Sequence, residues 1–458
     1  MDNVTQIAGL AGPDVRELRS RLAGEVYVPG DDAWDEARQA WNLTVDQRPT
    51  AVVVVAGAND VAETIDFARE NGLRVAPQGT GHAASAFADL HDTILLKTHR
   101  LRGVTIDPER QIARAEAGAI WIDVVEAAAE HGLAALAGSS PDVGVVGYTL
   151  GGGLSWLARK HGIGANNVTA IELVTADGDF KRVDRDHDPD LFWALRGGGG
   201  SFAVVTAIEL DLFPYEQVYA GILWFPVERA AEVLTAWRNW TEIVPEEMTS
   251  VGRIMQFPPL EFIPEPVRGK SFVIVEAIYA GEAVDGEHWV APLRELGPVM
   301  DTVQTMSMPE LSRLHMDPEG PAPGVGDGTM LTAFDAEAIE AFVANTVGAP
   351  LLSAEVRHLG GAVARPKAEH GALTHFGDEY LMFAVGIAPV PPAAAAVHGA
   401  LERLFAALEP WQAEHTYSNF AERGRKPGSF HSEAAYHRLK RIKAQVDPEN
   451  VIRANHEL

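Results

Sequence analysis

The sequence predicts an α+β protein that is divided into domains. Its 458 residues are too many for one compact core, so two or more domains are expected. Up to Pro214, β-branched runs alternate with helical patterns. Beyond it, prolines cluster and strand-like runs lie between helical ones, which indicates a second α+β domain. The predicted boundaries are residues 1–214, 215–410 and 411–458, the last being a polar and aromatic tail.

Each predicted element has its own local signal. The β-branched run from Thr50 to Ala56 suits a buried strand, Asn59-Asp60 is expected to cap the next helix, and Asn71-Gly72 closes that helix. Two hairpins are predicted, turning on Asp107-Pro108 and Asp177-Gly178. The other predicted elements are the helix 121–130 and the strands 73–76, 94–96, 202–213, 272–279, 353–359 and 380–387.

Composition narrows the class of protein. The absence of cysteine excludes disulfides, thiolate metal sites and thiol nucleophiles. The formal charge of −27 argues against nucleic acid or an anionic membrane as a partner, and no apolar run is long enough to span a bilayer. Met1 to Val4 lack the features of a secretory signal, so a cytoplasmic protein is expected. The basic stretch from His437 to Lys443 is interpreted as one solvated face of a C-terminal helix.

Glycine-rich loops dominate the first part of the chain. His82 ends the sequence Pro77-Gln78-Gly79-Thr80-Gly81-His82, and further glycines fall at 144–153 and 197–200. Glycine lets a backbone come close to a flat ligand, because no side chain stands in the way. The segment 144–153 is not a dinucleotide fingerprint, since it follows Ser139-Ser140-Pro141 rather than a strand. Each loop alone is compatible with a structural turn, but together they favour a long ligand whose phosphates face backbone amides.

Several of these motifs occur in one known order. The segments 74–82, 140–153, 164–168, 191–199 and 417–420, with Asp447-Pro448 near the end, resemble the FAD-linked oxidases that are berberine bridge enzyme-like. The resemblance implies a PCMH-type FAD-binding domain, of the vanillyl-alcohol-oxidase type, built from two α+β subdomains in residues 1–214. It also implies a substrate domain whose antiparallel sheet, covered by helices, lies over the isoalloxazine, and a tail that returns to the FAD.

The resemblance also implies how FAD is held. The histidine at the position of His82 is bonded to the 8α-methyl group of the flavin in this family, although a free loop histidine is the alternative. Ser140 stands where many relatives have a second tether from cysteine, so one tether at most is expected. The implied FAD-binding residues are Pro77, Gln78, Gly79, Thr80, Gly81, His82, Ser139, Ser140, Val143, Gly144, Gly147, Tyr148, Gly152, Asn166, Val168, Tyr417 and Asn419.

The expected reaction is a flavin-dependent oxidation. A flavin accepts hydride at N5 when a substrate C–H lies roughly 3–3.5 Å away. The expected substrate is a small organic molecule, namely an amine, an alcohol or a secondary metabolite, and the expected electron acceptor is O2. The resemblance implies that Val143 leaves oxygen a path to the flavin. A dehydrogenase that passes electrons to another acceptor is the alternative.

Three residues are candidates for catalysis. Tyr417 is a candidate base or orienting group, because Leu154 replaces the tyrosine that plant relatives use; packing under the ring is the alternative. A phenol with a pKa near ~10 needs a nearby cation to act as a base, and Arg357 is the candidate cation. Strand alternation places Glu355 and Arg357 on one face and His358 on the other. A paired Glu and Arg on the surface is the alternative interpretation.

Overall fold

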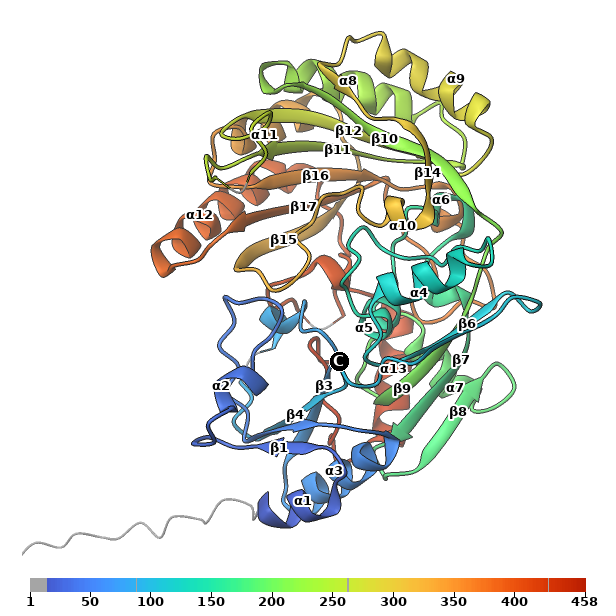
Figure 1. Cartoon of the computed structure of the whole chain (residues 1–458), viewed down its shortest axis with the longest axis vertical. Coiled ribbons are helices and arrows are strands. Elements are labelled where there is room, and N and C mark those ends of the chain that lie inside the picture. Colours follow the sequence, from blue (N-terminus) through green and yellow to red (C-terminus); the bar gives the residue numbers. More distant parts are fainter. Residues whose placement is uncertain (1–14, 88, 262, 427) are drawn as a thin grey trace, which may run out of the picture.

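The computed structural model describes residues 15–87, 89–261, 263–426 and 428–458, and three β-sheets organise it (Figure 1). The prediction made for Met1 to Val4 lies outside the described residues. No helix in the described ranges is both long and apolar enough to cross a membrane. The sheets are mixed or antiparallel, with helices packed on them, so the predicted α+β class is confirmed.

The first sheet has four strands and carries the predicted ligand loop at the end of one of them. Its order is β1-β2-β4-β3; β2, β4 and β3 are parallel and β1 is antiparallel. Apolar residues of α1 and α3 pack against it. The elements are α1 (Val15–Arg21), β1 (Glu25–Tyr27), α2 (Trp34–Ala37), β2 (Ala51–Val54), α3 (Ala58–Glu70), β3 (Arg74–Gln78) and β4 (Thr93–Lys97).

The start of α3 differs from the prediction. The helix begins at Ala58 after an extended Gly57, so Asn59-Asp60 do not cap it. The carboxylate of Asp60 instead accepts backbone N–H groups of Ala23, Gly24 and Ala56, at 2.8–2.9 Å. Asp60 therefore serves tertiary contacts with the neighbouring loop, which outweigh the local capping preference.

The second sheet has five antiparallel strands in the order β5-β6-β9-β7-β8. Both predicted hairpins are confirmed, as β5–β6 and β7–β8, and Gly178 in the second turn has a φ of +83°. The elements of this part are β5 (Val104–Asp107), β6 (Ile112–Glu116), α4 (Trp121–Ala129), α5 (Val145–Leu150), α6 (Ala158–His161), β7 (Val168–Thr175), β8 (Phe180–Asp184), α7 (Pro189–Leu195) and β9 (Ala203–Asp211).

The third sheet has eight strands, and four helices cover one face of it (Figure 1). Its order is β13-β10-β12-β11-β16-β17-β15, with β14 also paired to β10, and its pairs are antiparallel. The strands are β10 (Gln217–Pro226), β11 (Met248–Gln256), β12 (Ser271–Tyr279), β13 (Met300–Asp301), β14 (Gln304–Ser307), β15 (Gly324–Leu331), β16 (Ser353–His358) and β17 (Tyr380–Ile387). The helices are α8 (Ala230–Thr241), α9 (Ala283–Arg294), α11 (Ala336–Thr346) and α12 (Pro391–Leu408), with α10 (Met308–Leu311) outside this layer.

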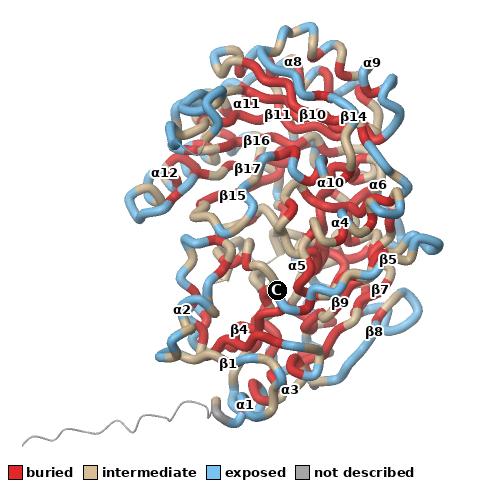
Figure 2. Tube along the Cα trace, in the orientation of Figure 1, coloured by how far each residue is buried: buried red, intermediate tan, exposed pale blue. Residues whose placement is uncertain are grey.

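Burial divides the third sheet into two unlike faces. Figure 2 shows its central strands as buried along most of their length. The helix-covered face is apolar and includes Val273, Ala354 and Met382. The opposite face, toward the first part of the chain, carries charged side chains on β11, β12 and β16 among its apolar ones. A site that uses charge chemistry is therefore expected on the face without helices.

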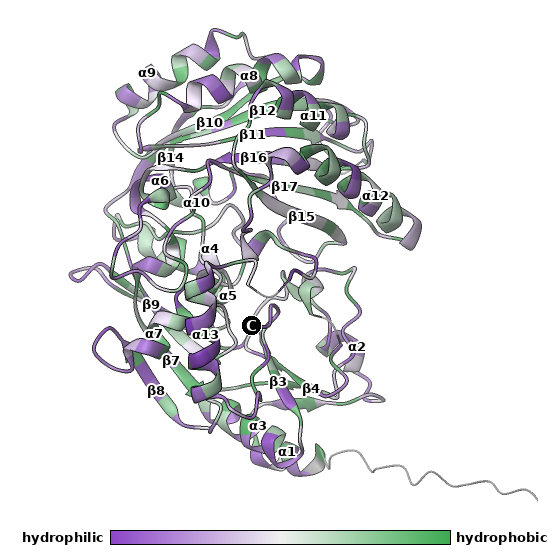
Figure 3. Cartoon of the chain, turned by 180° about the vertical axis from the view of Figure 1, so that it is seen from behind, coloured by the Kyte–Doolittle hydropathy of each residue, from purple (hydrophilic) through white to green (hydrophobic). Residues whose placement is uncertain are grey.

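The C-terminal segment brings the chain back to the strand that precedes the His82 loop. After α13 (Glu433–Val446), which Figure 3 shows as largely hydrophilic, Val75 on β3 donates its N–H to the Val451 carbonyl (2.8 Å). Lys443 is not part of a solvated face as predicted. Its ammonium donates to the carbonyls of Ser201 (2.7 Å) and Ile452 (2.8 Å), and this fixes the returning tail.

Candidate functional site

The His82 turn follows directly from the end of β3. The imidazole stacks on Trp41, with ring centroids 4.1 Å apart, and its Nδ1 shares a hydrogen bond of 2.7 Å with Thr80 Oγ1. Gly81 has a φ of +90°, and a Cβ there would lie 3.0 Å from the Ala40 backbone. Glycine is thus required for the turn to pack against the segment that supplies Trp41.

Asp142 lies beside the other nitrogen of this histidine. His82 Nε2 is 3.5 Å from Asp142 Oδ1 and has no hydrogen-bond partner among the described residues. The carboxylate accepts hydrogen bonds from Trp41 Nε1 (2.6 Å), Ser140 Oγ (3.1 Å) and the Gly320 N–H (2.8 Å). Burial acts to raise the pKa of Asp142, but the contacts with His82, Gly320 and Trp41 outweigh it and lower that pKa to about 2. Asp142 is therefore ionised.

The tail lies directly against the triple-glycine turn. A Cβ on Gly151 would come within 1.9 Å of Asn419 Oδ1, so no larger residue fits there. Ser418 Oγ donates to the Gly151 carbonyl (3.0 Å). Tyr417 Oη accepts two hydrogen bonds, from the Gly153 N–H (2.9 Å) and from Asn419 Nδ2 (2.8 Å). The two motifs are thus joined by direct hydrogen bonds.

The Tyr417 phenol keeps its proton at neutral pH. The side chain is only 1% exposed. Burial raises the pKa of Tyr417 well above its ordinary value, although the Gly153 N–H, Asn419 and the charge of Arg357 act to lower it. Arg357 thus acts on the pKa of Tyr417 in the predicted sense, but burial outweighs its charge, so the phenol is not a ready base.

Glu355 and Arg357 lie on the charged face of the third sheet, not on the surface. They are 2% and 8% exposed, and Arg357 Nε donates to Glu355 Oε1 at 2.6 Å. Arg357 Nη2 also donates to Ser139 Oγ (3.0 Å), and the guanidinium lies 4.8 Å from the centre of the Phe420 ring. Arg357 therefore connects the sheet both to the loop at Ser139 and to the tail.

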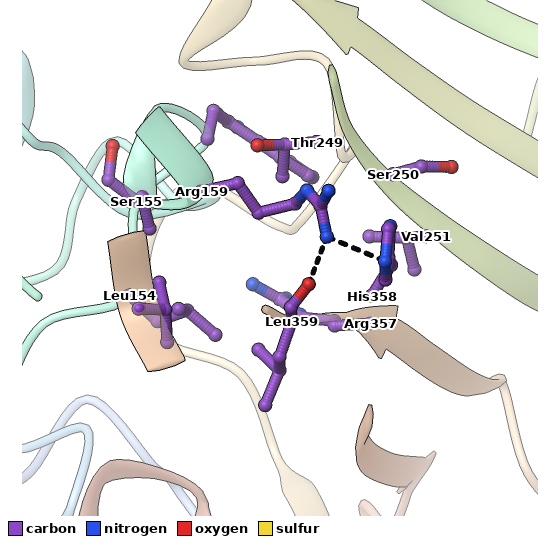
Figure 4. A pocket seen from close by; sticks show the side chains of 12 residues that line it. Leu154, Ser155, Arg159, Thr249, Ser250, Val251, Arg357, His358 and Leu359 are labelled. Carbon is purple, nitrogen blue, oxygen red and sulfur yellow. Dashed lines mark hydrogen bonds between the residues drawn. The ribbon is translucent and has the colours of Figure 1, made fainter. Parts of the chain in front are cut away.

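The predicted alternation along β16 also holds at His358. His358 Nε2 lies 2.6 Å from Arg159 Nη1, beside a small cavity (Figure 4), whereas Glu355 contacts His315 and Arg357. Arg159 donates to the Leu359 carbonyl as well. Burial, with a smaller contribution from Arg159, lowers the pKa of His358 to about 2, so the imidazole is neutral.

Three further buried groups, which the sequence analysis missed, complete an ionic network around Glu355. His315 lies between two carboxylates, with Nδ1 2.7 Å from Glu276 Oε2 and Nε2 2.7 Å from Glu355 Oε2. Arg253 donates to Glu276 (3.1 Å) and to the His315 carbonyl (2.7 Å). Burial and Arg253 act to lower the pKa of His315, but the two glutamates outweigh them and raise it to about 9.

Other residues predicted to bind FAD have structural contacts of their own. Tyr148 donates to the Leu136 carbonyl (3.1 Å). Asn166 donates to the Leu373 carbonyl (3.1 Å) and accepts from the Gly371 N–H (2.8 Å). Val168 begins β7. The Asn166 and Val168 positions are thus tied to packing between loops and strands, apart from the His82 turn and from the network around Glu355.

The comparisons with known proteins agree with this arrangement. Residues 49–184 match the family model described as "FAD binding domain", and residues 416–457 match the one described as "Berberine and berberine like". The fold and these two segments define an FAD-linked oxidoreductase. As the sequence motifs predicted, the chain carries both of the domains that the berberine bridge enzyme-like family models describe, and it has homologues and structural neighbours in that family.

Relatives in this family include characterised oxidases. The (R)-6-hydroxynicotine oxidase of Paenarthrobacter nicotinovorans is 36% identical over 218 residues, which are 47% of this chain and 48% of that enzyme. The chain thus aligns with about half the length of this curated relative. The crystal structure of 6-hydroxy-D-nicotine oxidase from Arthrobacter nicotinovorans superposes with a TM-score of 0.83 at 26% identity, covering 94% of this chain and 97% of that one.

Two more distant structures share the fold. BBE-like 1 of Physcomitrella patens has a TM-score of 0.84 at 18% identity, with coverage of 96% and 98%. The grass pollen allergen Phl p 4 has a TM-score of 0.79 at 20% identity, with coverage of 93% and 95%. Wild-type Phl p 4 is described as a glucose dehydrogenase, and an isoleucine-to-valine variant of it as a glucose oxidase.

The residues present fit FAD. An added Cβ at Gly147 on α5, or at Gly199 or Gly200, would meet no atom within 4 Å, so the backbone at these positions is open to a ligand. A Cβ on Gly144 would lie 3.7 Å from Thr80, which places the loop 139–144 beside the His82 turn. The unpartnered Nε2 of His82 lies at the same place. The turns at 79–82 and 139–144 are therefore suited to hold the cofactor.

The buried network generates a pH-dependent prediction. The raised pKa of His315 means that its charge stabilises the folded state fully below pH 6.5, its ordinary pKa, and that this contribution is lost as the pH rises through about 9. His315→Gln removes the cation between two buried carboxylates. At a pH below 6.5, the ordinary pKa of histidine, we expect the variant to have a free energy of unfolding about 3–5 kcal/mol lower than that of wild type.

Denaturant unfolding of wild type and variant at low and high pH measures this effect. The difference in unfolding free energy between wild type and variant should shrink once the pH exceeds about 9, the pKa of His315 in the folded protein. His437→Gln, at an exposed position on α13, is the control and should change little at either pH. A deficit that is the same at both pH values would show that the charge of His315 is not what stabilises the network.

Proposed function

We propose that this protein is an FAD-dependent oxidase that takes hydride from a small organic substrate and passes the electrons to O2, giving H2O2. The proposal rests chiefly on one observation. Segments remote in sequence converge between the first part of the chain and the charged face of the third sheet: the loop at Ser139, the glycine turn at Gly153 and the tail at Tyr417. Membership in a family of FAD-linked oxidoreductases supports it.

When bound, FAD supplies the redox chemistry, because its ring accepts hydride at N5. The protein must orient the substrate, exclude water and balance charge. Arg357 supplies a fixed positive charge, since Glu355 and Ser139 hold its guanidinium in place. Tyr417 supplies a neutral phenol whose oxygen is fixed by two N–H donors. We propose that Tyr417 orients the substrate by hydrogen bonding.

The substrate is proposed to be an amine, an alcohol or a secondary metabolite. The similarity to an oxidase of (R)-6-hydroxynicotine supports a small organic molecule. A panel of such compounds tests the proposal, with H2O2 measured under air and loss of flavin absorbance measured without air. At least one compound should give both signals. Bleaching without peroxide under air would favour the dehydrogenase alternative, and no bleaching by any compound would contradict an oxidase of these classes.

We further propose that FAD is bonded covalently to His82. The imidazole is held in place by stacking on Trp41 and by the Thr80 hydroxyl at Nδ1, and it lies in the turn that is suited to hold the cofactor, which supports this proposal. Protein precipitated with acid is expected to stay yellow, and His82→Ala is expected to release its FAD under the same treatment. His91→Ala, at an exposed histidine, serves as the control and should retain its flavin. A colourless pellet from wild type would refute covalent attachment.

The proposed use of oxygen depends on Val143. This half-buried side chain packs in the loop that also carries Ser140, and its carbonyl accepts the N–H of Trp121 (3.0 Å). In Phl p 4 the change to valine accompanies the change from dehydrogenase to oxidase. Val143→Leu is expected to slow reoxidation of the reduced flavin by O2, because the larger side chain narrows the path. An unchanged rate in rapid-mixing measurements would remove Val143 from this role.

The role of Tyr417 is tested in the half-reaction that reduces the flavin. Tyr417→Phe keeps the ring and removes only the hydroxyl. We expect the reduction rate to fall by roughly 10²-fold, as for the loss of a positioned hydrogen-bonding group, with FAD content and folding preserved. Because the phenol is neutral over the neutral pH range, the wild-type rate should not rise there through titration of Tyr417. Equal reduction rates for the two proteins at every pH would make Tyr417 a packing residue.

A further inference from the structure

The environment of His82 is asymmetric in a way that bears on how the cofactor becomes attached. One edge of the imidazole faces a carboxylate, since Nε2 lies 3.5 Å from Asp142 Oδ1. The other nitrogen, Nδ1, faces the Thr80 hydroxyl at 2.7 Å. The ring as a whole retains 23% of its side-chain exposure, whereas Nε2 itself is buried. Nε2, the ring atom beside Asp142, is therefore closed to solvent.

We propose that Asp142 is a positioning residue for cofactor attachment, which keeps the proton of neutral His82 on Nε2 and leaves Nδ1 as the nucleophilic atom. This inference rests on the proposed covalent bond between FAD and His82. It adds Asp142 as the residue that sets the tautomer of His82, and Nδ1 as the atom of His82 that forms the bond.

The choice of nitrogen follows from electrostatics. A neutral imidazole has one N–H and one lone pair, and the partner of one nitrogen determines the state of the other. An ionised carboxylate repels a lone pair and attracts an N–H, so the proton belongs on Nε2, next to Asp142. Nδ1 then carries the lone pair, and the Thr80 hydroxyl donates to it. This arrangement has the logic of an aspartate that fixes the tautomer of a catalytic histidine.

The carboxylate is held by donors from three parts of the chain. Trp41 Nε1 (2.6 Å) comes from the segment that also stacks on the His82 ring, and Ser140 Oγ (3.1 Å) comes from its own loop. The Gly320 N–H (2.8 Å) comes from the loop before β15, in the part of the chain that carries the third sheet. Asp142 is thus fully oriented only when that loop is docked, which couples attachment to assembly of the site.

Attachment can be written with its atoms and electrons balanced. One bond forms between His82 Nδ1 and the 8α-methyl carbon of the flavin. One C–H bond of that methyl group and the Nε2–H bond of His82 are broken. The two electrons pass to O2, which takes up the two protons and becomes H2O2. Asp142 stays ionised, and its negative charge stabilises the positive charge of the imidazole until the Nε2 proton leaves.

The test compares covalent with total flavin in purified proteins. Asp142→Asn has nearly the same size but no charge, and it is expected to lower the covalent fraction by about 10-fold or more, as for the loss of a partner that orients a functional histidine. FAD released by acid from this variant should make up the difference. Asp142→Glu restores the carboxylate and should recover part of the covalent fraction, which a purely steric role would not predict.

A matched control separates a local effect from a general one. Asp89→Asn removes a carboxylate that lies 2.7 Å from His91 at an exposed position, outside the site. It should leave the covalent fraction unchanged. Incubation of each protein with added FAD under air, followed by flavin fluorescence in denaturing gels, gives the rate of attachment as a second measure.

The outcomes distinguish this inference from the proposal on which it rests. Wild type without covalent flavin would refute attachment at His82, and the inference would fall with it. Wild type with covalent flavin, and Asp142→Asn equal to it in both fraction and rate, would overturn the inference alone. If Asp142→Asn bound no FAD at all, Asp142 would be a residue of the binding site rather than a positioning residue, and the inference would again be wrong.

Discussion

The arrangement of the site depends on a set of charges buried beneath the third sheet. Burying an unpaired charge is costly, so such groups persist only when each finds a partner. Glu276, His315 and Glu355 alternate in sign at 2.7 Å, and Arg253 and Arg357 flank them. Arg357 extends the network to Ser139. The same contacts thus join three strands of the third sheet to the loop that carries Ser139.

Two hydrogen bonds also join parts of the chain that are far apart in sequence. The Gly320 N–H reaches Asp142, and the Tyr417 oxygen receives the Gly153 N–H. The first joins the loop before β15 to the loop that carries Asp142, and the second joins the glycine turn at Gly153 to the tail at Tyr417. We assign a role to both Asp142 and Tyr417. The site is therefore a property of the assembled protein, because neither the loops that carry Asp142 and Gly153 nor the third sheet contains it alone. This arrangement suits an enzyme in which orientation is the main contribution of the protein.

The local elements could be predicted well from the sequence, because their signals are local. The hairpin turn at Gly178 and the end of α3 at Asn71-Gly72 depend on backbone conformations that few residues adopt. The start of α3 was predicted wrongly, since Asp60 bonds to a loop far away in sequence. The prediction for Lys443 was wrong for a related reason: its ammonium pairs with the buried Asp447 carboxylate and donates to the carbonyls of Ser201 and Ile452.

The site could be predicted in part. The motifs around His82, Gly152 and Tyr417 pointed to FAD, and the alternation of β16 correctly separated Glu355 from His358. Trp41 and Asp142 were not predicted to act on His82, because a lone tryptophan has no local signature and Asp142 stood in a motif without an assigned role. His315 lies in a loop, and its two glutamate partners come from different strands, so only the folded chain brings them together.

The central claim is that this chain forms an FAD oxidase, and the reaction of its reduced flavin with oxygen tests that claim most directly. The protein is reduced without air, by light or by dithionite, and is then mixed rapidly with buffer that contains O2. We predict fast recovery of the oxidised flavin spectrum, with one H2O2 formed for each flavin. A flavin that stays reduced in the presence of O2, but is reoxidised at once by an added quinone or dye, would contradict the account.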